Sequence, residues 1–348
     1  MSDVRVLISG INYFGWSSLS LSKSMTDLAH TLSLSVKFGK EGSASSTALL
    51  RGSSIKVFVD DTPVFTGYIE KNSLSLADRS IQISCRSKTA DLIDCSVKDA
   101  SQLKELTTYQ LFSKLSSPFG VKVISLVDSS QKVSSVNVKA GETPFEIMSR
   151  IANENNIILQ TNGLGNLVMT SKDDSLNSTF LIEGENIIDA SFSDDSTGRF
   201  SEYICKSQDS TNNDNSGTAK DSGVERYRPK VMINEKETDS KGCEERAKRE
   251  ANLANAKSQS LDVTLFGWTD RENNLWDVNQ LLKVKIPFFG LNTNLLISSL
   301  TFNKDLSNGT TTNMKLIRPD SFEFKPPKEV KKGDDLIEAI RSAKTSNR

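Results

Sequence analysis

Apolar residues recur at every second position through the first hundred residues, and this period constrains the fold more than any other feature. Five segments show it: VRVLI from Val4, LSLSVKF from Leu32, IKVFV from Ile55, VFTGYIE from Val64 and IQISC from Ile81. Because successive side chains of a strand point to opposite faces, this alternation predicts half-buried strands. We therefore expect residues 1–100 to form an antiparallel β domain, a barrel or a sandwich.

Local signals refine this first domain. The DDTP turn joins two of its strands, and Gly67 inside a strand indicates a bulge or a close approach of another backbone. A short helix over KTADLIDCS closes the unit.

The period changes to that of a helix from about Ser101, which predicts a mixed α/β domain over residues 101–178. LKELTTYQLFSKLSSPFG is one helix, ended by Pro118 and Gly120. A second helix starts at a capping box formed by Thr143 and Glu146, with a buried stripe of Phe145, Met148 and Ile151 or Ala152. The hairpin IILQTNGLGNLVM follows, and its NGLGN loop is typical of a turn rather than of a phosphate cradle, because no helix begins after it.

Strands return over residues 179–320, where we expect a second β domain. The tract SQDSTNNDNSGTAKDSG is polar and is predicted to be a loop or an insertion. KGCEERAKREANLANAK is a helix whose apolar stripe consists only of Ala247, Ala251 and Ala254, so it packs closely against another element or lies between subunits. Together these two segments place an insertion at about 208–257.

The last segment, 321–348, is predicted to be an extension that orders on a partner or does not order at all. Its lysine cluster is the candidate partner contact: Lys325, Lys328, Lys331 and Lys332. We expect deletion of the residues after Pro319 to leave the β domains folded.

Composition excludes several functions. The formal net charge of −1, from 43 basic and 44 acidic residues, provides no overall field that would hold nucleic acid. The four cysteines lie far apart in the sequence and are interpreted as free thiols in a reducing compartment. The N-terminus does not resemble a signal peptide and no apolar run is long enough to span a membrane, so we expect synthesis in the cytoplasm and no membrane insertion.

The single histidine argues against most catalytic sites. His30 shares a strand face with Leu28, Leu32 and Leu34, where a histidine with its hydrogen bonds satisfied is expected. One histidine cannot supply a Ser-His-Asp triad or a multi-histidine zinc site. The acidic pairs Asp60-Asp61, Asp173-Asp174, Asp194-Asp195 and Asp334-Asp335 lie in polar turns typical of solvated carboxylates. We expect no catalytic residue, no metal site and no cofactor.

An ordered set of segments resembles a known family. VFTGYIE, CRSKTADLIDCS, the capped helix with its hairpin, and the stretch from ERAKREANLANAK to RPDSF occur in this order. The most specific run passes through Trp268, Trp276, Asn279, Val284 and Pro287. With these segments the chain resembles the baseplate hub proteins of contractile-tailed, Mu-like bacteriophages up to about Phe322.

The resemblance implies an α+β, mainly antiparallel β fold with two β-barrel domains similar to a tail-tube subunit, decorated by small mixed α/β domains. It also implies a homotrimer whose six barrels match a hexameric tail tube. Its partners are then the tube or a tube-terminating protein, the central spike and other baseplate proteins. DNA passes through the channel without specific binding, and the chain is located in the virion tail.

Two alternatives remain open from the residues. GETPFEIMSRIANENNI resembles the helical start of a LysM peptidoglycan-binding repeat, which favours a module that binds, or less readily cleaves, the host cell wall. A carbohydrate-binding β protein without phage context needs exposed aromatic residues on a groove, and the 7% aromatic content is assigned to cores. The two tryptophans of FGWTDRENNLWDVNQ suit barrel ends or subunit seams better than the lip of an active site.

Overall fold

The computed structural model shows a mainly antiparallel β protein with several sheets and four α-helices in the part of the chain that it describes. The described residues are 3–38, 51–98, 103–136, 138–155, 157–208, 214–233, 239–305 and 309–322. The chain divides into two compact units, each made of three segments. The first consists of Met1–Ser171, Phe266–Val278 and Ser298–Asn313; the second consists of Lys172–Leu265, Asn279–Ile297 and Met314–Arg348.

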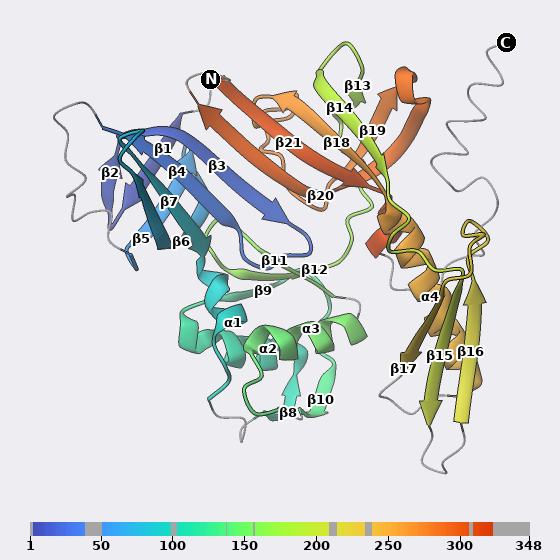
Figure 1. The fold of residues 1–348 in the computed structure, drawn as a ribbon. Coiled ribbons are helices and arrows are strands. Elements are labelled where there is room, and N and C mark those ends of the chain that lie inside the picture. Colours follow the sequence, from blue (N-terminus) through green and yellow to red (C-terminus); the bar gives the residue numbers. More distant parts are fainter. Residues whose placement is uncertain are drawn as a thin grey trace. The chain divides into compact units, whose positions relative to one another are not determined.

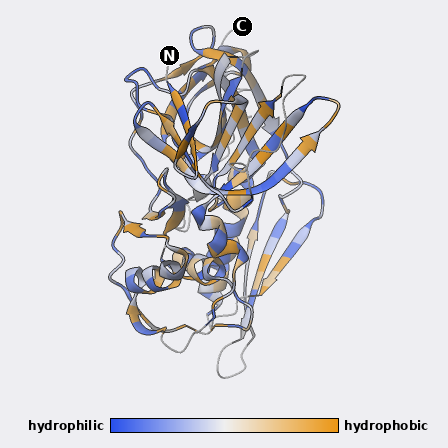
Figure 2. Cartoon of the chain, turned by 90° about the vertical axis from the view of Figure 1, so that its left-hand side faces the viewer, coloured by the Kyte–Doolittle hydropathy of each residue, from blue (hydrophilic) through white to orange (hydrophobic). Residues whose placement is uncertain are grey.

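The first unit is built on one large sheet (Figure 1). Its strands are β1 (Val4–Ile8), β2 (Ile11–Tyr13), β3 (Trp16–Ser24), β4 (Thr31–Lys37), β5 (Ser54–Val59), β6 (Thr62–Ser75), β7 (Ser80–Ser87), the second half of β20 (Leu291–Asp305) and the first half of β21 (Gly309–Ile317), in the order β21-β20-β3-β4-β7-β6-β5-β1-β2. The five expected strands are confirmed, and buried residues alternate with more exposed ones along them. Figure 2 shows apolar and polar residues interspersed along the strands of the chain. Strand β3 was not expected from the sequence, although Leu19 and Leu21 alternate there with serines.

Gly67 lies where two strands come unusually close together. A Cβ at this position would be 1.9 Å from the carbonyl oxygen of Arg86 on the neighbouring strand β7. The register between β6 and β7 also shifts between Ile69 and Lys71. The predicted close approach is therefore confirmed, and only glycine fits there.

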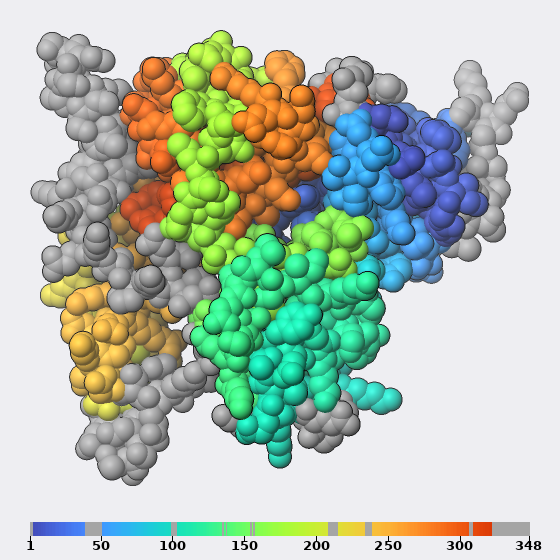
Figure 3. All heavy atoms as spheres, turned by 180° about the vertical axis from the view of Figure 1, so that it is seen from behind, coloured from blue at the N-terminus to red at the C-terminus, as the bar shows by residue number. Residues whose placement is uncertain are grey.

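The mixed α/β module follows this sheet within the first unit and has its own core. Its elements are η2 (Lys88–Ala90), α1 (Asp91–Asp94), β8 (Lys104–Thr107), α2 (Thr108–Ser116), η3 (Ser117–Phe119), β9 (Val123–Ser125), β10 (Lys132–Ser135), α3 (Pro144–Glu154), β11 (Ile158–Thr161) and β12 (Leu167–Thr170). Figure 3 shows the teal and green atoms of this module gathered in one body. Buried side chains from α2 and α3, among them Phe112 and Met148, form the centre of its core.

Both helices begin at capping boxes. Thr143 accepts a hydrogen bond from the Glu146 N–H, and the Glu146 carboxylate accepts one from the Thr143 N–H, as predicted. Phe145 is only partly buried, whereas Ile147, which the prediction omitted, is fully buried. The same motif at Thr107 and Gln110 starts α2 at Thr108. The helix expected from residue 103 onward is therefore wrong at its beginning, where residues 104–107 form a strand.

The second unit contains a smaller set of paired strands. These are β13 (Leu181–Ile182), β14 (Ile187–Asp194), β18 (Gln259–Phe266), β19 (Leu281–Ile286), the first half of β20 and the second half of β21 (Gly309–Ile317), with η4 (Pro287–Phe289) and η5 (Pro319–Phe322). β14 pairs only with β18 among the described strands, so it is an edge strand (Figure 1). The described strands form no closed barrel.

A small module is inserted between β14 and β18. It consists of β15 (Glu202–Gln208), β16 (Asp214–Lys220), β17 (Pro229–Ile233) and α4 (Ser240–Ser258). The Asp195 N–H donates to the Ser258 carbonyl oxygen at 2.7 Å, so the chain leaves and re-enters the β14–β18 pair at neighbouring points. The loop expectation is wrong for residues 214–220, which form β16; its part at 209–213 lies outside the described residues.

The alanine stripe of α4 is confirmed and faces the strands of its own module. Ala247 and Ala251 are buried together with Tyr203, Cys205 and Cys243. Small side chains let the helix backbone approach β16 so closely that a Cβ on Gly217 would be 2.1 Å from the Glu244 nitrogen. The thin stripe therefore reflects close helix–sheet packing inside one chain.

The C-terminal boundary needs one correction. η5 contacts α4, its Ser321 is buried, and Arg318 forms an ion pair with Asp320. A deletion after Pro319 removes part of this packing. The end of the described structure at Phe322 is the better place for a truncation.

Replacing Gly217 with alanine is predicted to lower the free energy of unfolding by about 1–3 kcal/mol, because the added methyl group clashes with the α4 backbone. Gly198→Ala is the matched control, since a Cβ there meets no atom within 4 Å. Urea denaturation of both variants measures the difference. Equal stability of the two variants would contradict the close packing of α4.

Candidate functional site

Trp268 and Trp276 both lie in the first unit. Trp268 is buried, and its Nε1–H donates to the carbonyl oxygens of Asn303 at 3.1 Å and Thr311 at 3.0 Å. The backbone N–H of Trp276 donates to the Trp268 carbonyl oxygen, and this hydrogen bond closes the intervening turn. Inside that turn the Asp270 carboxylate accepts hydrogen bonds from backbone N–H groups. The Asp270 carboxylate thus binds the turn itself, as the scaffold interpretation expects.

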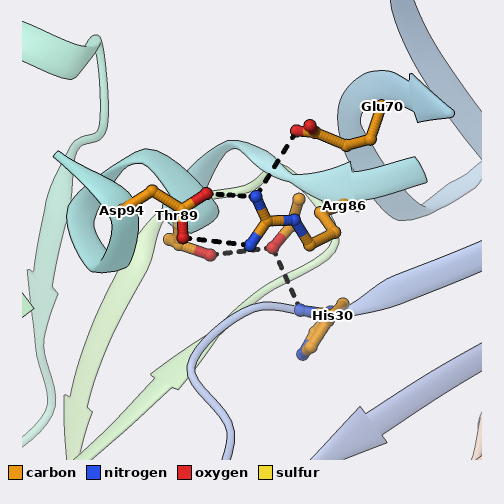
Figure 4. Close-up of polar contacts among 6 residues, drawn as sticks. His30, Glu70, Arg86, Thr89 and Asp94 are labelled. Atoms are coloured by element: carbon orange, nitrogen blue, oxygen red, sulfur yellow. Dashed lines mark hydrogen bonds and ion pairs between the residues drawn. The ribbon is translucent and has the colours of Figure 1, made fainter.

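His30 precedes β4 and is buried, but its side chain is not satisfied as expected. The backbone N–H donates to the Ser87 hydroxyl at 3.0 Å, while the Nδ1 atom has no hydrogen-bond partner among the described residues (Figure 4). Burial, and then the positive charge of Lys23, hold the pKa of His30 well below its ordinary value. His30 is therefore neutral near pH 7 and enclosed by the fold.

A row of hydrogen-bonded hydroxyl groups leads from the backbone of His30 into the mixed α/β module. The Ser87 and Thr89 hydroxyls form a hydrogen bond at 2.8 Å, and the Thr89 and Thr161 hydroxyls form another at 2.8 Å. Thr161 donates to the Leu28 carbonyl oxygen at 2.6 Å. This buried chain of hydrogen bonds joins the large sheet to the hairpin β11–β12 and serves as an internal connection.

A second polar group lies next to this chain of hydroxyls. Arg86 forms a two-pronged ion pair with Asp94 of α1 and also lies 3.8 Å from Glu70 of β6 (Figure 4). The hydrogen bonds from Arg86 lower the pKa of the Asp94 carboxyl group and raise that of the arginine itself. The arginine holds the first helix of the module against the sheet.

The acidic pairs lie in turns and at strand ends, as expected. Asp60 and Asp61 form the β5–β6 turn, and Asp173 accepts from the N–H and hydroxyl of Ser175. Asp194 ends β14, and hydrogen bonds from Thr197 lower the pKa of Asp195. Asp334-Asp335 lies outside the described residues. Within the described chain no three His, Cys, Asp or Glu side chains gather as a metal site would require.

The NGLGN loop is the turn of the β11–β12 hairpin, as predicted. A Cβ on Gly163 would be 1.9 Å from the Pro63 carbonyl oxygen, and the Thr66 hydroxyl donates to the Gly163 carbonyl oxygen at 2.9 Å. The glycines of this loop therefore allow it to pack on β6.

The mixed α/β module also contains a cavity of about 410 Å³. Apolar side chains of α2 and η3, including Leu115 and Phe119, line it, with Lys98 and Lys114 among its polar residues. Their arrangement includes no nucleophile paired with a general base.

Two cysteines that are distant in sequence meet in the inserted module. Cys205 and Cys243 are both buried free thiols in the same cluster. Burial raises the pKa of Cys205 to about 11, and its hydrogen bond with Cys243 acts in the same direction. A protonated, enclosed thiol is a poor nucleophile.

The candidate partner residues Lys325, Lys328, Lys331 and Lys332 lie outside the described residues. Sequence reasoning did not single out the exposed apolar residues that the structure places near the edge strands. Ile11 and Phe14 lie on and after β2, and Ile188 and Phe266 lie on β14 and the end of β18. Alternation alone does not reveal them, because an edge residue follows the same period as a covered one. None of the helices in the described chain is both long and apolar enough to cross a membrane.

Comparisons with known proteins agree along most of the chain. Three family models match: "Mu phage baseplate assembly protein GpP-like, N-terminal" over residues 3–88, "Baseplate hub protein gp44-like, second domain" over 89–171, and "Mu phage baseplate assembly protein GpP, fourth domain" over 239–325. The baseplate hub protein gp44 of Escherichia phage Mu is 29% identical over 340 residues, which cover 92% of this chain and 89% of that protein.

Solved structures share the fold. The 43 kDa tail protein of prophage MuSo2 from Shewanella oneidensis has a TM-score of 0.82 at 28% identity, covering 92% of this chain and 99% of that one. A tail protein from Neisseria meningitidis has a TM-score of 0.78 at 22% identity, with the same two coverages.

The buried His30 predicts a specific dependence of stability on pH. Above about pH 6.5 both the folded and the unfolded chain carry a neutral imidazole, so this group adds no pH dependence. Below it the unfolded chain takes up a proton that the folded chain resists, because the folded pKa is depressed. Stability should then fall by up to about 1.4 kcal/mol per pH unit until the folded pKa is reached.

Chemical denaturation of the wild type and His30→Gln between pH 7.5 and 5 tests this. In the variant, the free energy of unfolding should depend less steeply on pH, because the contribution of His30 is absent. The carboxylates that both proteins share contribute equally to the two slopes. Identical slopes would show that the folded state accepts the proton freely.

Proposed function

Because this chain belongs to the Mu-like baseplate hub proteins, we propose that it forms a trimeric ring at the tip of a contractile tail. The ring joins the sixfold tail tube to the threefold central spike and surrounds the DNA channel. The observation that carries this proposal is similarity to a baseplate hub protein along 92% of the chain. A structural baseplate role follows from the family; the ring, its symmetry and its channel are the proposal.

The arrangement of strands supports a fold that is completed by assembly. Among the described strands, β2 and β14 each pair with a single neighbour and end the sheets of the two units. In the proposal, residues 1–100 and 179–320 provide two tube-like domains, separated by the mixed domain 101–178 and followed by the extension 321–348. Three copies then supply six such domains, which match a hexameric tube. Their barrels close by pairing between chains rather than within one.

Exposed apolar side chains support contacts near these edges. Phe14 is 83% exposed, and Phe266 and Phe288 are 75% and 77% exposed. Apolar surface left open on one chain is typical of protein–protein contact sites. In the proposal, neighbouring chains cover this apolar surface on each unit.

The proposed role needs no reaction. The described residues include one histidine, and it is enclosed rather than placed in the cavity of the mixed module. We propose that the chain acts by assembly with the tube or a tube-terminating protein, the central spike and other baseplate proteins. The lysines at 325, 328, 331 and 332 are then a contact for one of these partners.

The purified chain is predicted to form trimers at high concentration. Multi-angle light scattering should give a mass near three times 38.3 kDa, with a monomer–trimer equilibrium on dilution. A chain that stays monomeric at every accessible concentration, even with the spike protein added, would contradict the ring.

Truncation after Phe322 is predicted to leave the cooperative unfolding transition unchanged, because η5 and its contact with α4 are kept. The truncated protein should bind a neighbouring baseplate protein more weakly, as measured by co-purification with each candidate partner. The matched control replaces the four lysines by glutamine in the full-length chain, and it should show the same loss. A lower unfolding midpoint after truncation would place the tail in the fold instead.

A further inference from the structure

The outer face of β3, β4 and β7 is unusual because uncharged polar residues occupy its central positions on three adjacent strands, with Lys37 and Arg86 only at strand ends. Leu19 and Leu21, Leu32 and Leu34, and Ile81 and Ile83 point into the core, so the alternate residues lie on the other face. We call this set the neutral face: Ser18, Ser20, Ser22, Thr31, Ser33, Ser35, Gln82 and Ser84.

The strand registers arrange these residues in rows. Ser20 pairs with Ser33, which pairs with Ser84. Ser18 pairs with Ser35, which pairs with Gln82. Strand β20 extends the rows on one side, since Asn303 lies opposite Ser20 and Thr301 opposite Ser22. The result is a continuous surface of small polar side chains that crosses four strands.

Charged residues lie only at the borders of this surface. Lys37 ends β4, Lys71 lies on β6 beyond Ser84, and Asp305 is the last residue of β20. Arg86 ends one row, and its charge is neutralised by Asp94 and Glu70. The same sheet carries charges farther along, where Arg5 stacks on Phe58 at 5.0 Å. Lack of charge is therefore a property of this region and not of the whole sheet.

Side chains of this face form hydrogen bonds across strands with one another and with side chains of β20. Ser20 donates to the Asn303 amide oxygen at 2.9 Å, and the hydroxyls of Ser22 and Thr301 are 2.9 Å apart. Ser33 accepts a hydrogen bond from Gln82. These bonds reduce the capacity of the face to bind an external group, while water can still wet it.

A protein interface does not fit this composition. The cores of interfaces are enriched in aromatic residues, methionine and arginine and depleted in serine. Exposed protein surfaces, in turn, usually mix lysine, arginine, glutamate and aspartate. A wetted surface without charge or apolar side chains suits a polyanion that must slide past, because each lysine or arginine on a phosphate adds affinity by releasing counterions.

We propose that the neutral face lines the channel of the ring and faces the double-stranded DNA that moves through it. This inference rests on the hub function proposed above and specifies which surface of the first unit points inward. Serine side chains are small and uncharged, and they keep the channel wall hydrated. The neutral face therefore contributes to DNA passage because it does not bind the DNA.

The test introduces positive charge without changing the fold. Ser20→Lys combined with Ser35→Lys places two lysines diagonally on neighbouring strands, which gives six in a trimer. Ser20→Gln with Ser35→Gln is a neutral control of similar length. Ser216→Lys with Thr218→Lys adds the same charge to exposed positions on β16 of the inserted module.

Tailed particles carrying each pair are counted by electron microscopy, and infections per particle are measured. The lysine pair on the neutral face should assemble in normal numbers and deliver DNA at least tenfold less often, while both controls match the wild type. Normal delivery with lysines in place would overturn the proposal. Failure of the lysine pair to form particles, with the glutamine pair intact, would also overturn it, because the face would then contact protein.

The hub function is checked separately by immunogold labelling of wild-type particles. Label at the tail tip supports it, whereas label elsewhere refutes the hub function whatever the lysine variants do.

Discussion

The pairing of β20 with β3 is the contact on which the first unit depends. Residues 299–305 align with residues 18–24, and the side-chain pairs Ser20–Asn303 and Ser22–Thr301 lie within this alignment. Because one residue of slippage would move every side chain to the opposite face, this register decides which residues enter the core. It also requires the C-terminal part of the chain to be present before the sheet is complete. The first unit therefore cannot fold as an isolated N-terminal fragment with the same edge.

The same register separates two chemistries on the two faces of one sheet. Leucine, isoleucine and valine side chains on one face bury apolar surface, which is the main stabilising contribution to the fold. The opposite face is then free to differ in composition, and its centre over β3, β4 and β7 consists of uncharged polar residues. Stability and the proposed function thus use alternate positions of the same strands. Charge can be changed on one face with little effect on the core behind it.

Much of the fold follows from local patterns in the sequence. Alternation predicts β1, β4, β5, β6 and β7, and the capping box at Thr143 fixes the start of α3. β3 is missed because serine has little strand preference, and β16 is missed because its Asn, Ser and Gly residues resemble a loop. Strand β16 is stabilised instead by α4, whose backbone packs closely against Gly217. The unsatisfied Nδ1 of His30 and the meeting of Cys205 with Cys243 depend on long-range packing, which no local pattern encodes.

Electron cryo-microscopy of tails from the particle that contains this chain tests the hub account most directly. The account predicts a ring at the end of the tube with three copies of the chain, two β units from each copy continuing the sixfold wall, and β3, β4 and β7 bordering the central channel. A map in which this chain lies at the periphery of the baseplate, or in which six copies surround the axis, would contradict it.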